Sequence, residues 1–491
     1  MSSKSSAIII GSGFGGLALA VRLQSAGIAT TVVEGRDRPG GRAYVWKRNG
    51  FTFDAGPTVI TDPACLEELW SLSGGRMADD VQLQPVEPFY RLIWNDGTRF
   101  DYASDQEMLD AEIGRLDPED VAGYARFLAY SKAVYEEGYV KLGAVPFLDF
   151  SSMIKAAPAL ARFQAWRSVY SVVSGFVRNE KLRQILSFHT LLVGGNPMGT
   201  SSIYALIHHL EKRGGVWFPQ GGTNALVNGM VALFERLGGT LLLGEKVKAI
   251  VHSDRRVTGV VTETGLLMEA AMVASNADLV GTYDMIAGSA YAARAARRLR
   301  RKRFSPSLFV VHFGLKGEFP GISHHSILFS DRYGPLVDDI YRTGRLPEDP
   351  SIYLHHPSAS DAGMAPAGMS TFYALAPVPH LGKASLDWSV EGPRYRDIVL
   401  GRVRDFLIPD LDQRIDTCFH YTPSDFADDL GAHLGSAFSL EPILTQSAWF
   451  RGHNRDDHFG NLYLVGAGTH PGAGIPGVVG SAKATASLMI S

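Results

Sequence analysis

The sequence predicts an α/β protein (α+β overall) built around a parallel sheet to which distant parts of the chain contribute. Near the N-terminus, an apolar run at residues 7–10 leads into a glycine-rich turn and then into a helical pattern. A second strand pattern at 30–33 completes a strand, helix and strand within about 30 residues, which is the size of a parallel βαβ unit. Strand patterns return at 240–275 and at 462–465, so we expect those segments to join the same sheet.

The composition is that of a folded protein with several structural regions. The 491 residues are 45% apolar and 20% charged, and a chain of this length is expected to divide into about two to four regions. The net charge of −3, without a Lys/Arg-rich run or zinc-finger spacing, gives no reason to expect a nucleic-acid partner. Cys65 and Cys418 are far apart, so neither a redox pair nor a metal site is expected.

The first glycine-rich turn has the pattern of a dinucleotide site. Gly11, Gly13 and Gly16 form G-x-G-x-x-G between the first strand and its helix. The first glycine allows a tight turn, the second lets the backbone approach a pyrophosphate, and the third permits close helix packing. Glu34 ends the second strand, where its carboxylate can accept hydrogen bonds from both ribose hydroxyls. Together these residues predict a Rossmann-type fold with a bound dinucleotide.

A second glycine motif follows directly in the segment RDRPGGRA. Its glycines, Gly40 and Gly41, would let the chain pass close to a cofactor, and Arg38 and Arg42 could neutralise a diphosphate. A plain exposed turn is the alternative.

A third glycine-rich segment lies near the C-terminus. Residues 459–482 contain no Asp, Glu, Lys or Arg and are long enough to span a bilayer. Seven glycines and two prolines argue against a membrane span, because they would leave backbone groups unpaired in lipid. We instead expect a strand, a glycine turn, a loop and then a helix near Gly477, whose N-terminus can direct backbone N–H groups at a part of a bound cofactor where negative charge gathers.

These three motifs, in this order, resemble the FAD-dependent amine oxidase superfamily and, within it, the bacterial phytoene desaturases. The resemblance extends over nearly the whole chain. It includes FTFDAGPTVI (51–60), GTSSIYALIHHLE (199–211), GGVWFPQGGTNALV (214–227), VASNADLV (273–280), YALAPVPHLG (373–382) and QSAWFRGHNRD (446–456).

The motifs and the resemblance together imply FAD as the cofactor, with the backbone of Val247 at the adenine. The predicted FAD-binding residues are Gly11, Gly13, Phe14, Gly15, Gly16, Glu34, Arg36, Gly40, Gly41, Arg42, Gly56, Pro57, Thr58, Val247, Gly466, Ala467, Gly468, Gly474, Ile475, Pro476 and Val478.

The predicted domains follow from the positions of these motifs. A discontinuous FAD-binding domain (1–70, 215–300 and 440–491) carries an inserted substrate-binding domain (71–110 and 301–439) and a helical, membrane-associating lid (111–214).

The resemblance implies stepwise desaturation of 15-cis-phytoene toward neurosporene, lycopene or beyond. Each step would transfer a hydride to flavin N5 and lose a proton from the neighbouring carbon, with oxygen or a quinone as the electron acceptor. Other readings stay open: a flavin amine oxidase, a carotenoid isomerase or ketolase, a dehydrosqualene desaturase, or a non-catalytic protein that binds carotenoid or flavin.

No proton acceptor stands out in the sequence. Asp54, His380, Glu441 and His470 lie in family-like segments and are the candidates. Asp54 could equally cap the AGPT turn, and a histidine beside a proline is more often a packed loop residue.

A water-insoluble hydrocarbon substrate implies contact with a membrane. The spacing of apolar residues predicts one amphipathic helix that begins with Pro158 at its first position and contains Arg162, Arg167 and Arg178. Its apolar face comprises Leu160, Phe163, Trp166, Val169, Tyr170, Val173 and Phe176. An ordinary core face is the alternative. With no signal-peptide pattern, we expect a cytoplasmic protein attached peripherally to the inner face of the cell membrane, and a homo-oligomer is left open.

Overall fold

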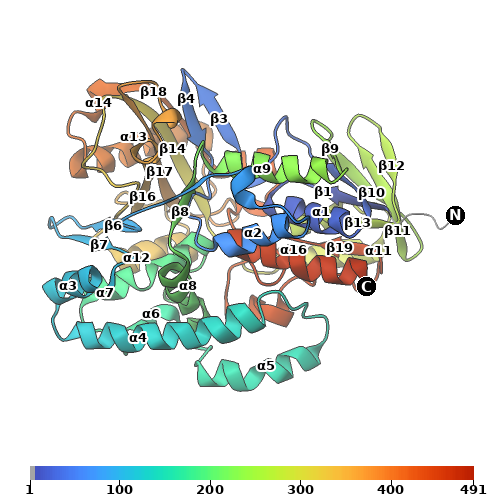
Figure 1. The fold of residues 1–491 in the computed structure, drawn as a ribbon, viewed down its shortest axis with the longest axis horizontal. Helices are drawn as coiled ribbons and strands as arrows, with labels where there is room; N and C mark the ends of the chain where they lie inside the picture. The colour runs from blue at the N-terminus through green and yellow to red at the C-terminus, as the bar shows by residue number, and fades with distance from the viewer. Residues whose placement is uncertain (1–5) are drawn as a thin grey trace.

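The computed structural model describes residues 6–491, and its first sheet contains five parallel strands (Figure 1). The strand order is β19, β13, β1, β2, β9, so the beginning, middle and end of the chain meet in one sheet. The predicted α/β class with a parallel sheet is confirmed. The strands are β1 (Ser6–Ile10), β2 (Ala29–Val33), β9 (Thr240–Leu242), β13 (Met272–Ser275) and β19 (Leu462–Leu464).

Both faces of this sheet are covered. Ala7 and Ile9 of β1 pack with the helices on one face, whereas Ile8 and Ile10 pack with a second layer on the other, as the two-residue period of a strand requires. The helical layer contains α1 (Phe14–Ser25), α2 (Pro63–Ser71), α9 (Thr223–Arg236) and α16 (Ile475–Ile490). The other layer contains β10 (Val247–Ser253), β11 (Arg256–Thr262), β12 (Leu267–Glu269), α10 (Leu279–Asp284) and α11 (Ala290–Arg300).

A seven-stranded sheet forms the second core, in the order β18, β14, β17, β16, β15, β6, β7. Its neighbours are antiparallel except for β15 and β6. Phe309 and Val311 of β14 pack with α13, whereas Leu308 and Val310 belong to the core on the opposite face. The elements are β6 (Tyr90–Ile93), β7 (Arg99–Tyr102), β14 (Ser307–Lys316), β15 (His325–Leu328), β16 (Ile352–His355), β17 (Met369–Val378), β18 (Ile415–Tyr421) and α13 (Trp388–Phe406).

Shorter elements surround the two sheets. Two ladders pair β3 (Val45–Arg48) with β4 (Phe51–Asp54) and β5 (Leu83–Pro85) with β8 (Trp217–Pro219). The short helices are α12 (Tyr333–Asp338), α14 (Leu411–Arg414) and α15 (Pro423–Leu430).

Residues 106–214, which follow β7 in the chain, are mainly helical, and most of their helices lie in the lower part of Figure 1. Among residues 6–491, no helix is long and apolar enough to cross a membrane. The helices are α3 (Gln106–Leu116), α4 (Asp120–Tyr135), η3 (Glu136–Lys141), α5 (Phe150–Arg162), α6 (Val169–Val173), α7 (Glu180–Ile185), η4 (Phe188–Val193), η5 (Ser202–Ala205) and α8 (Leu206–Gly214).

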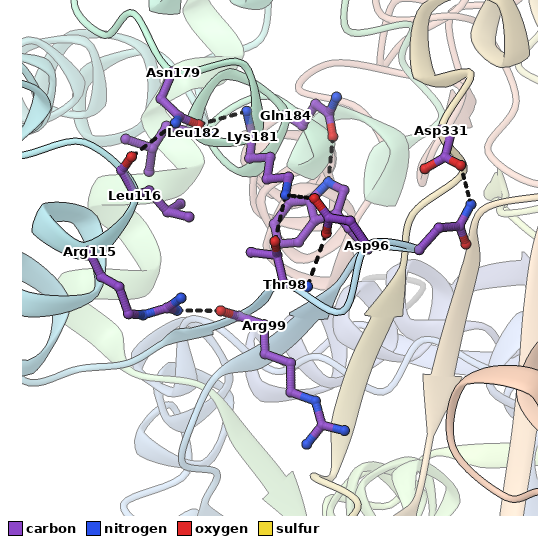
Figure 2. Close-up of polar contacts among 12 residues, drawn as sticks. Asp96, Thr98, Arg99, Arg115, Leu116, Asn179, Lys181, Leu182, Gln184 and Asp331 are labelled. Atoms are coloured by element: carbon purple, nitrogen blue, oxygen red, sulfur yellow. Dashed lines mark hydrogen bonds and ion pairs between the residues drawn. The ribbon is translucent and has the colours of Figure 1, made fainter.

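Polar contacts attach this helical region to the β6–β7 hairpin (Figure 2). Lys181 of α7 contacts the Asp96 carboxylate through Nζ, and Nζ also donates to Thr98 Oγ1 at 2.6 Å. The hydrogen bond from Lys181 lowers the pKa of Asp96. Beside them, Gln184 Oε1 accepts from the indole Nε1 of Trp94 at 2.8 Å. These contacts hold α7 against the second sheet, directly before η4.

The predicted helix beginning at Pro158 is wrong. Helix α5 begins at Phe150, where the Asp149 side chain caps it, and Pro158 lies inside it. The chain then turns through Gln164, which has a φ of +52°, and starts α6 with Ser168 as its N-cap. The turn is stabilised by tertiary pairing, because Val169 N donates to Thr200 O and Ser168 forms a β-bridge with Ser201. The regular apolar spacing therefore came from two separate helices.

Candidate functional site

A cavity of about 930 Å³ extends from the carboxyl ends of the parallel strands to the second sheet. At one end its wall consists of the loops that follow β1, β2 and β13, where open parallel sheets bind ligands. At the other end lie side chains of β14, β15, β16 and β17, and the helices α5, η4 and α8 complete the wall. The glycine motifs and an apolar chamber thus belong to one continuous space.

Every predicted FAD-binding residue lines this cavity except Gly16 and Gly466. These two glycines permit close packing behind the wall. A Cβ on Gly16 would lie 2.1 Å from Gly11 O, and one on Gly466 would lie 2.3 Å from Asn276 Nδ2. Gly16 therefore serves helix packing, the role that the motif predicts for its third glycine.

The first and second glycine motifs touch each other. Gly13 forms a parallel β-bridge with Gly40, and Gly40 N donates to Ser12 O at 3.1 Å. Gly41 adopts a φ of +55°, and a Cβ there would lie 3.5 Å from Gly13 Cα. Two glycine backbones this close leave an open strip beside the start of α1, where a diphosphate could reach the main chain.

Two helix N-termini reach the cavity. In α1 and α16 the N-cap residues are Gly13 and Gly474, and within the described chain neither helix receives a side-chain cap. The first backbone N–H groups are therefore available to an anion, and the helix dipole favours one.

Arg42 shows that the site suits a negatively charged group. Burial lowers the pKa of this guanidinium, and its Nε has no hydrogen-bond partner among the residues that the structure describes. Its Nη2 makes one long contact, 3.4 Å to Ser436 O. A buried guanidinium without a carboxylate partner is well matched to a diphosphate.

Glu34 lies at the end of β2, as predicted, but its carboxylate already accepts hydrogen bonds from the protein. Oε2 accepts from Ser12 N at 2.8 Å and from Ser12 Oγ at 2.7 Å, and Oε1 accepts from Arg36 N at 3.0 Å. An ionised carboxylate offers about four acceptor positions, so it can also accept from ribose. Glu34 thus orders the first glycine loop in addition to facing the cavity.

We expect Glu34→Ala to weaken FAD binding by about one to three powers of ten, because hydrogen bonds to a charged acceptor contribute about 1.5–3 kcal/mol each. Glu34→Gln keeps part of the contact to Ser12 and should lose less. Fluorescence titration of FAD measures both affinities, and turnover at saturating FAD should return close to the wild-type rate. An unchanged affinity for Glu34→Ala would show that FAD does not depend on this carboxylate.

The loop that follows β13 also belongs to the site, although its residues were not predicted from the sequence. Asn276 Nδ2 donates to Val465 O at 3.0 Å, and Asn276 Oδ1 lies only 2.9 Å from where a Cβ on Gly13 would be. Asn276 and Asp278 both line the cavity. The segment VASNADLV was recognised as family-like, yet nothing local indicated that its asparagine packs between the first and third glycine motifs.

The four candidate bases occupy different environments. His470 lines the cavity, and its Nε2 donates to Leu142 O at 2.8 Å, whereas Asp54, His380 and Glu441 are not part of the wall. Glu441 pairs with Arg303 at 2.8 Å. Burial raises the pKa of Asp54 to about 7 and lowers the pKa of both His380 and His470 to about 4.

Behind the cavity wall lies a group of buried histidines that the sequence did not predict. Tyr353 OH bonds to His325 Nδ1 at 2.7 Å and to Thr58 Oγ1 at 2.9 Å, which connects the wall to the histidine group. Ring nitrogens of His324, His325 and His355 lie within 4.8 Å of one another, an arrangement that could accept a metal ion. No local pattern predicts this group, because His325 lies on β15, His324 directly precedes that strand, and His355 lies on β16, which pairs with β15 only in the folded sheet.

Comparison with known proteins agrees with this geometry. Residues 14–490 match the family of flavin-containing amine oxidoreductases. The chain is 60% identical to a lycopene-forming phytoene desaturase of Paracoccus sp., over 99% of this chain and 97% of that protein. It is 57% identical to a lycopene-forming enzyme of Pseudescherichia vulneris (98% of each chain) and 42% identical to a neurosporene-forming enzyme of Cereibacter sphaeroides (98% and 94%).

Solved structures share the fold at low identity. A putrescine oxidase has a TM-score of 0.66 and 15% identity over 99% of both chains, and the cyclohexylamine oxidase of Brevibacterium oxydans has a TM-score of 0.63 and 16% identity over 99% of both. Within residues 6–491, three features all fit FAD: the glycine cradle, the Arg42 Nε without a hydrogen-bond partner, and the two helix N-termini without a side-chain cap. The chain belongs to the flavin-containing amine oxidoreductase family and, within it, to the bacterial phytoene desaturases, as an FAD-dependent oxidoreductase.

Proposed function

We propose that this protein desaturates 15-cis-phytoene and carries the reaction through to lycopene. The relatives that are 55–60% identical to the chain are lycopene-forming phytoene desaturases, whereas two neurosporene-forming relatives are 41–42% identical. The greater similarity to the first group favours lycopene as the product.

The observation that carries the proposal is the apolar chamber that continues from the FAD site. Its wall includes Leu160, Phe163, Leu191, Ile207 and Leu210, contributed by three helical segments. A hydrocarbon can form no hydrogen bonds, so such a wall binds it through burial alone, at about 0.8 kcal/mol per methylene group.

The protein's contribution to the reaction is position and exclusion of water. When bound, FAD would accept a hydride from the substrate at flavin N5. The chamber wall would hold one C–H bond of the polyene in place, and the neighbouring alkene would stabilise the developing positive charge. Oxygen or a membrane quinone is the proposed final electron acceptor.

The test is to add FAD-loaded protein to liposomes that contain 15-cis-phytoene. Visible absorption bands of a longer polyene should appear, and chromatography should identify lycopene as the end product. Neurosporene as the end product would correct the number of steps, and an isomerised polyene without new double bonds would assign an isomerase. Unchanged phytoene would contradict the desaturase proposal.

We also propose that the protein docks peripherally on the cytoplasmic face of the cell membrane, through the surface around α5. One face of α5 lines the cavity through Met153, Ala156 and Leu160. On the outside, Ile154 is 62% exposed and Trp166, in the following turn, is 67% exposed. Exposed apolar and aromatic side chains beside Lys155 and Arg162 suit an interface with anionic lipid, next to the chamber that the substrate must enter.

We expect the double variant Ile154→Glu and Trp166→Glu to bind anionic liposomes about 10²- to 10⁴-fold more weakly, because burying each apolar side chain contributes about 1.5–3 kcal/mol. Flotation of the protein with liposomes measures the change. Leu267→Glu is the matched control, since Leu267 is 57% exposed but lies on β12, far from α5 (Figure 1). Equal flotation of the double variant and the control would remove α5 as the docking surface.

A further inference from the structure

Two ionisable side chains interrupt the apolar wall of the chamber. His189, in η4, and Glu211, in α8, both line the cavity, and their side chains are only 2% and 1% exposed. Glu211 Oε2 lies 2.9 Å from His189 Nε2, and Glu211 Oε1 accepts from Tyr90 OH at 2.8 Å. Burying such groups is unfavourable, and a chamber that merely holds a hydrocarbon has no need of them.

The contacts of Glu211 determine which nitrogen of His189 can act as a base. A carboxylate oxygen next to Nε2 favours the tautomer that carries its proton there, so the lone pair lies on Nδ1. His189 Nδ1 has no hydrogen-bond partner among residues 6–491. Among these residues, His189 Nε2 and Glu211 Oε2 approach to 2.9 Å without full hydrogen-bond geometry, so their contact is an electrostatic one. Nδ1 is the ring nitrogen that points away from this contact, and it is the one open to a proton from the substrate.

The position of His189 suits a base that works beside the redox centre. At the other end of η4, Val193 Cγ1 lies 3.6 Å from where a Cβ on Gly474 would be, in the loop predicted to hold the flavin end of FAD. Four residues of a 3₁₀-helix separate His189 from Val193 by about 8 Å. His189 and the loop predicted to hold the flavin thus lie at opposite ends of one short helix, and both line the same cavity.

His470 also lines the cavity, and its Nδ1 has no hydrogen-bond partner in the described part of the chain, but its surroundings oppose a positive charge. Its Nε2 donates to the neutral carbonyl of Leu142, and Arg451 lies near enough to disfavour its protonation, in addition to burial. Of the two histidines, His189 is the one with a carboxylate beside it, which would stabilise the imidazolium once it forms.

We propose that His189 is the base that removes the proton in each desaturation step and that Glu211 is its positioning residue; this inference rests on the proposed function. After one carbon has lost a hydride with its electron pair to the oxidised cofactor, the neighbouring C–H bond breaks. Its electron pair becomes the new double bond, and its proton moves to His189 Nδ1. The imidazolium then returns the proton to solvent before the next step. Per double bond, the substrate loses two electrons and two hydrogens.

The test compares FAD-loaded variants on phytoene liposomes. His189→Gln, which cannot act as a base, should lower kcat by about 10²- to 10⁴-fold with little change in KM. Glu211→Gln keeps an acceptor for Tyr90 but loses the charge, and should lower kcat about 10- to 150-fold. His209→Gln is the matched control. His209 lies on α8, two residues before Glu211, but it packs on Tyr135 and is not part of the cavity wall.

Chemical rescue separates a base from a structural residue. In His189→Ala, added imidazole should restore a substantial part of kcat, while FAD content and the unfolding temperature stay close to those of wild type. The inference is overturned if His189→Gln turns over within threefold of wild type, or if imidazole fails to rescue His189→Ala. If the wild-type protein leaves phytoene unchanged, the proposed function itself has failed, which is a different result from either of these.

Discussion

Gly13→Val should yield a folded protein that is purified without FAD. A Cβ on Gly13 would lie 2.9 Å from Asn276 Oδ1, at the N-terminus of α1 and on the wall of the cavity. The branched valine side chain would extend further into the strip between Gly13 and Gly41. Loss of two or three backbone hydrogen bonds to a charged diphosphate, at about 1.5–3 kcal/mol each, lowers FAD affinity by about 10²-fold or more.

Absorbance of the purified protein near 450 nm and fluorescence titration with FAD measure this loss. Gly13→Ala is a graded variant, because its methyl group meets only the end of the Asn276 side chain, and we expect it to bind FAD with intermediate affinity. Gly114→Ala is the control, since a Cβ there makes an ordinary 3.7 Å contact with Val121, away from the cavity. Wild-type affinity in Gly13→Val would mean that the diphosphate does not pass this glycine.

The parts of the fold that the sequence predicted are those encoded over short distances along the chain. The first strand, Gly11, the helix that follows and Glu34 form one local unit, so their arrangement follows from turn geometry and strand periodicity. The local pattern did not predict the structure around Pro158 correctly, where two helices replace the one expected. There, pairing with Thr200 and Ser201 decides where the chain turns, and an apolar spacing pattern does not contain that information.

The candidate site shows the same division. Residues in glycine motifs were placed at the cavity from sequence, whereas Asn276, His189 and Glu211 depend on which elements meet in space. The buried histidines are a further case: His312, His325 and His355 lie on β14, β15 and β16. In the second sheet β15 pairs with β16, and β17 lies between β16 and β14, so only the folded sheet brings these strands together.

Buried histidines make the stability of the fold sensitive to acid. Burial lowers the pKa of His312 and of His325 to about 3, and lowers that of His356, His380 and His470 to about 4. In the unfolded chain a histidine has a pKa of about 6.5. Below this pH the unfolded state therefore binds protons that the folded state does not bind. Each group therefore destabilises the fold by about 2 kcal/mol at pH 5, at 1.36 kcal/mol per pH unit.

Asp54 acts in the opposite direction. Its pKa is raised to about 7 in the folded protein, chiefly by burial, whereas an unfolded aspartate has a pKa of about 3.9. Between these values the folded state takes up a proton that the unfolded state does not, which stabilises the fold as the pH falls. From pH 7 to pH 5 this contributes about 2 kcal/mol, against about 10 kcal/mol lost through the five histidines.

The net expectation is that the free energy of unfolding falls by about 8 kcal/mol between pH 7 and pH 5, a large part of the usual stability of about 5–15 kcal/mol. Urea unfolding followed by circular dichroism at several pH values measures this. His312→Gln can still donate to Asp54 O and should reduce the loss by about 2 kcal/mol, whereas Asp54→Asn removes the opposing contribution and should increase it by about 2 kcal/mol. If both variants showed the wild-type dependence on pH, these buried groups would not be the source of the acid sensitivity.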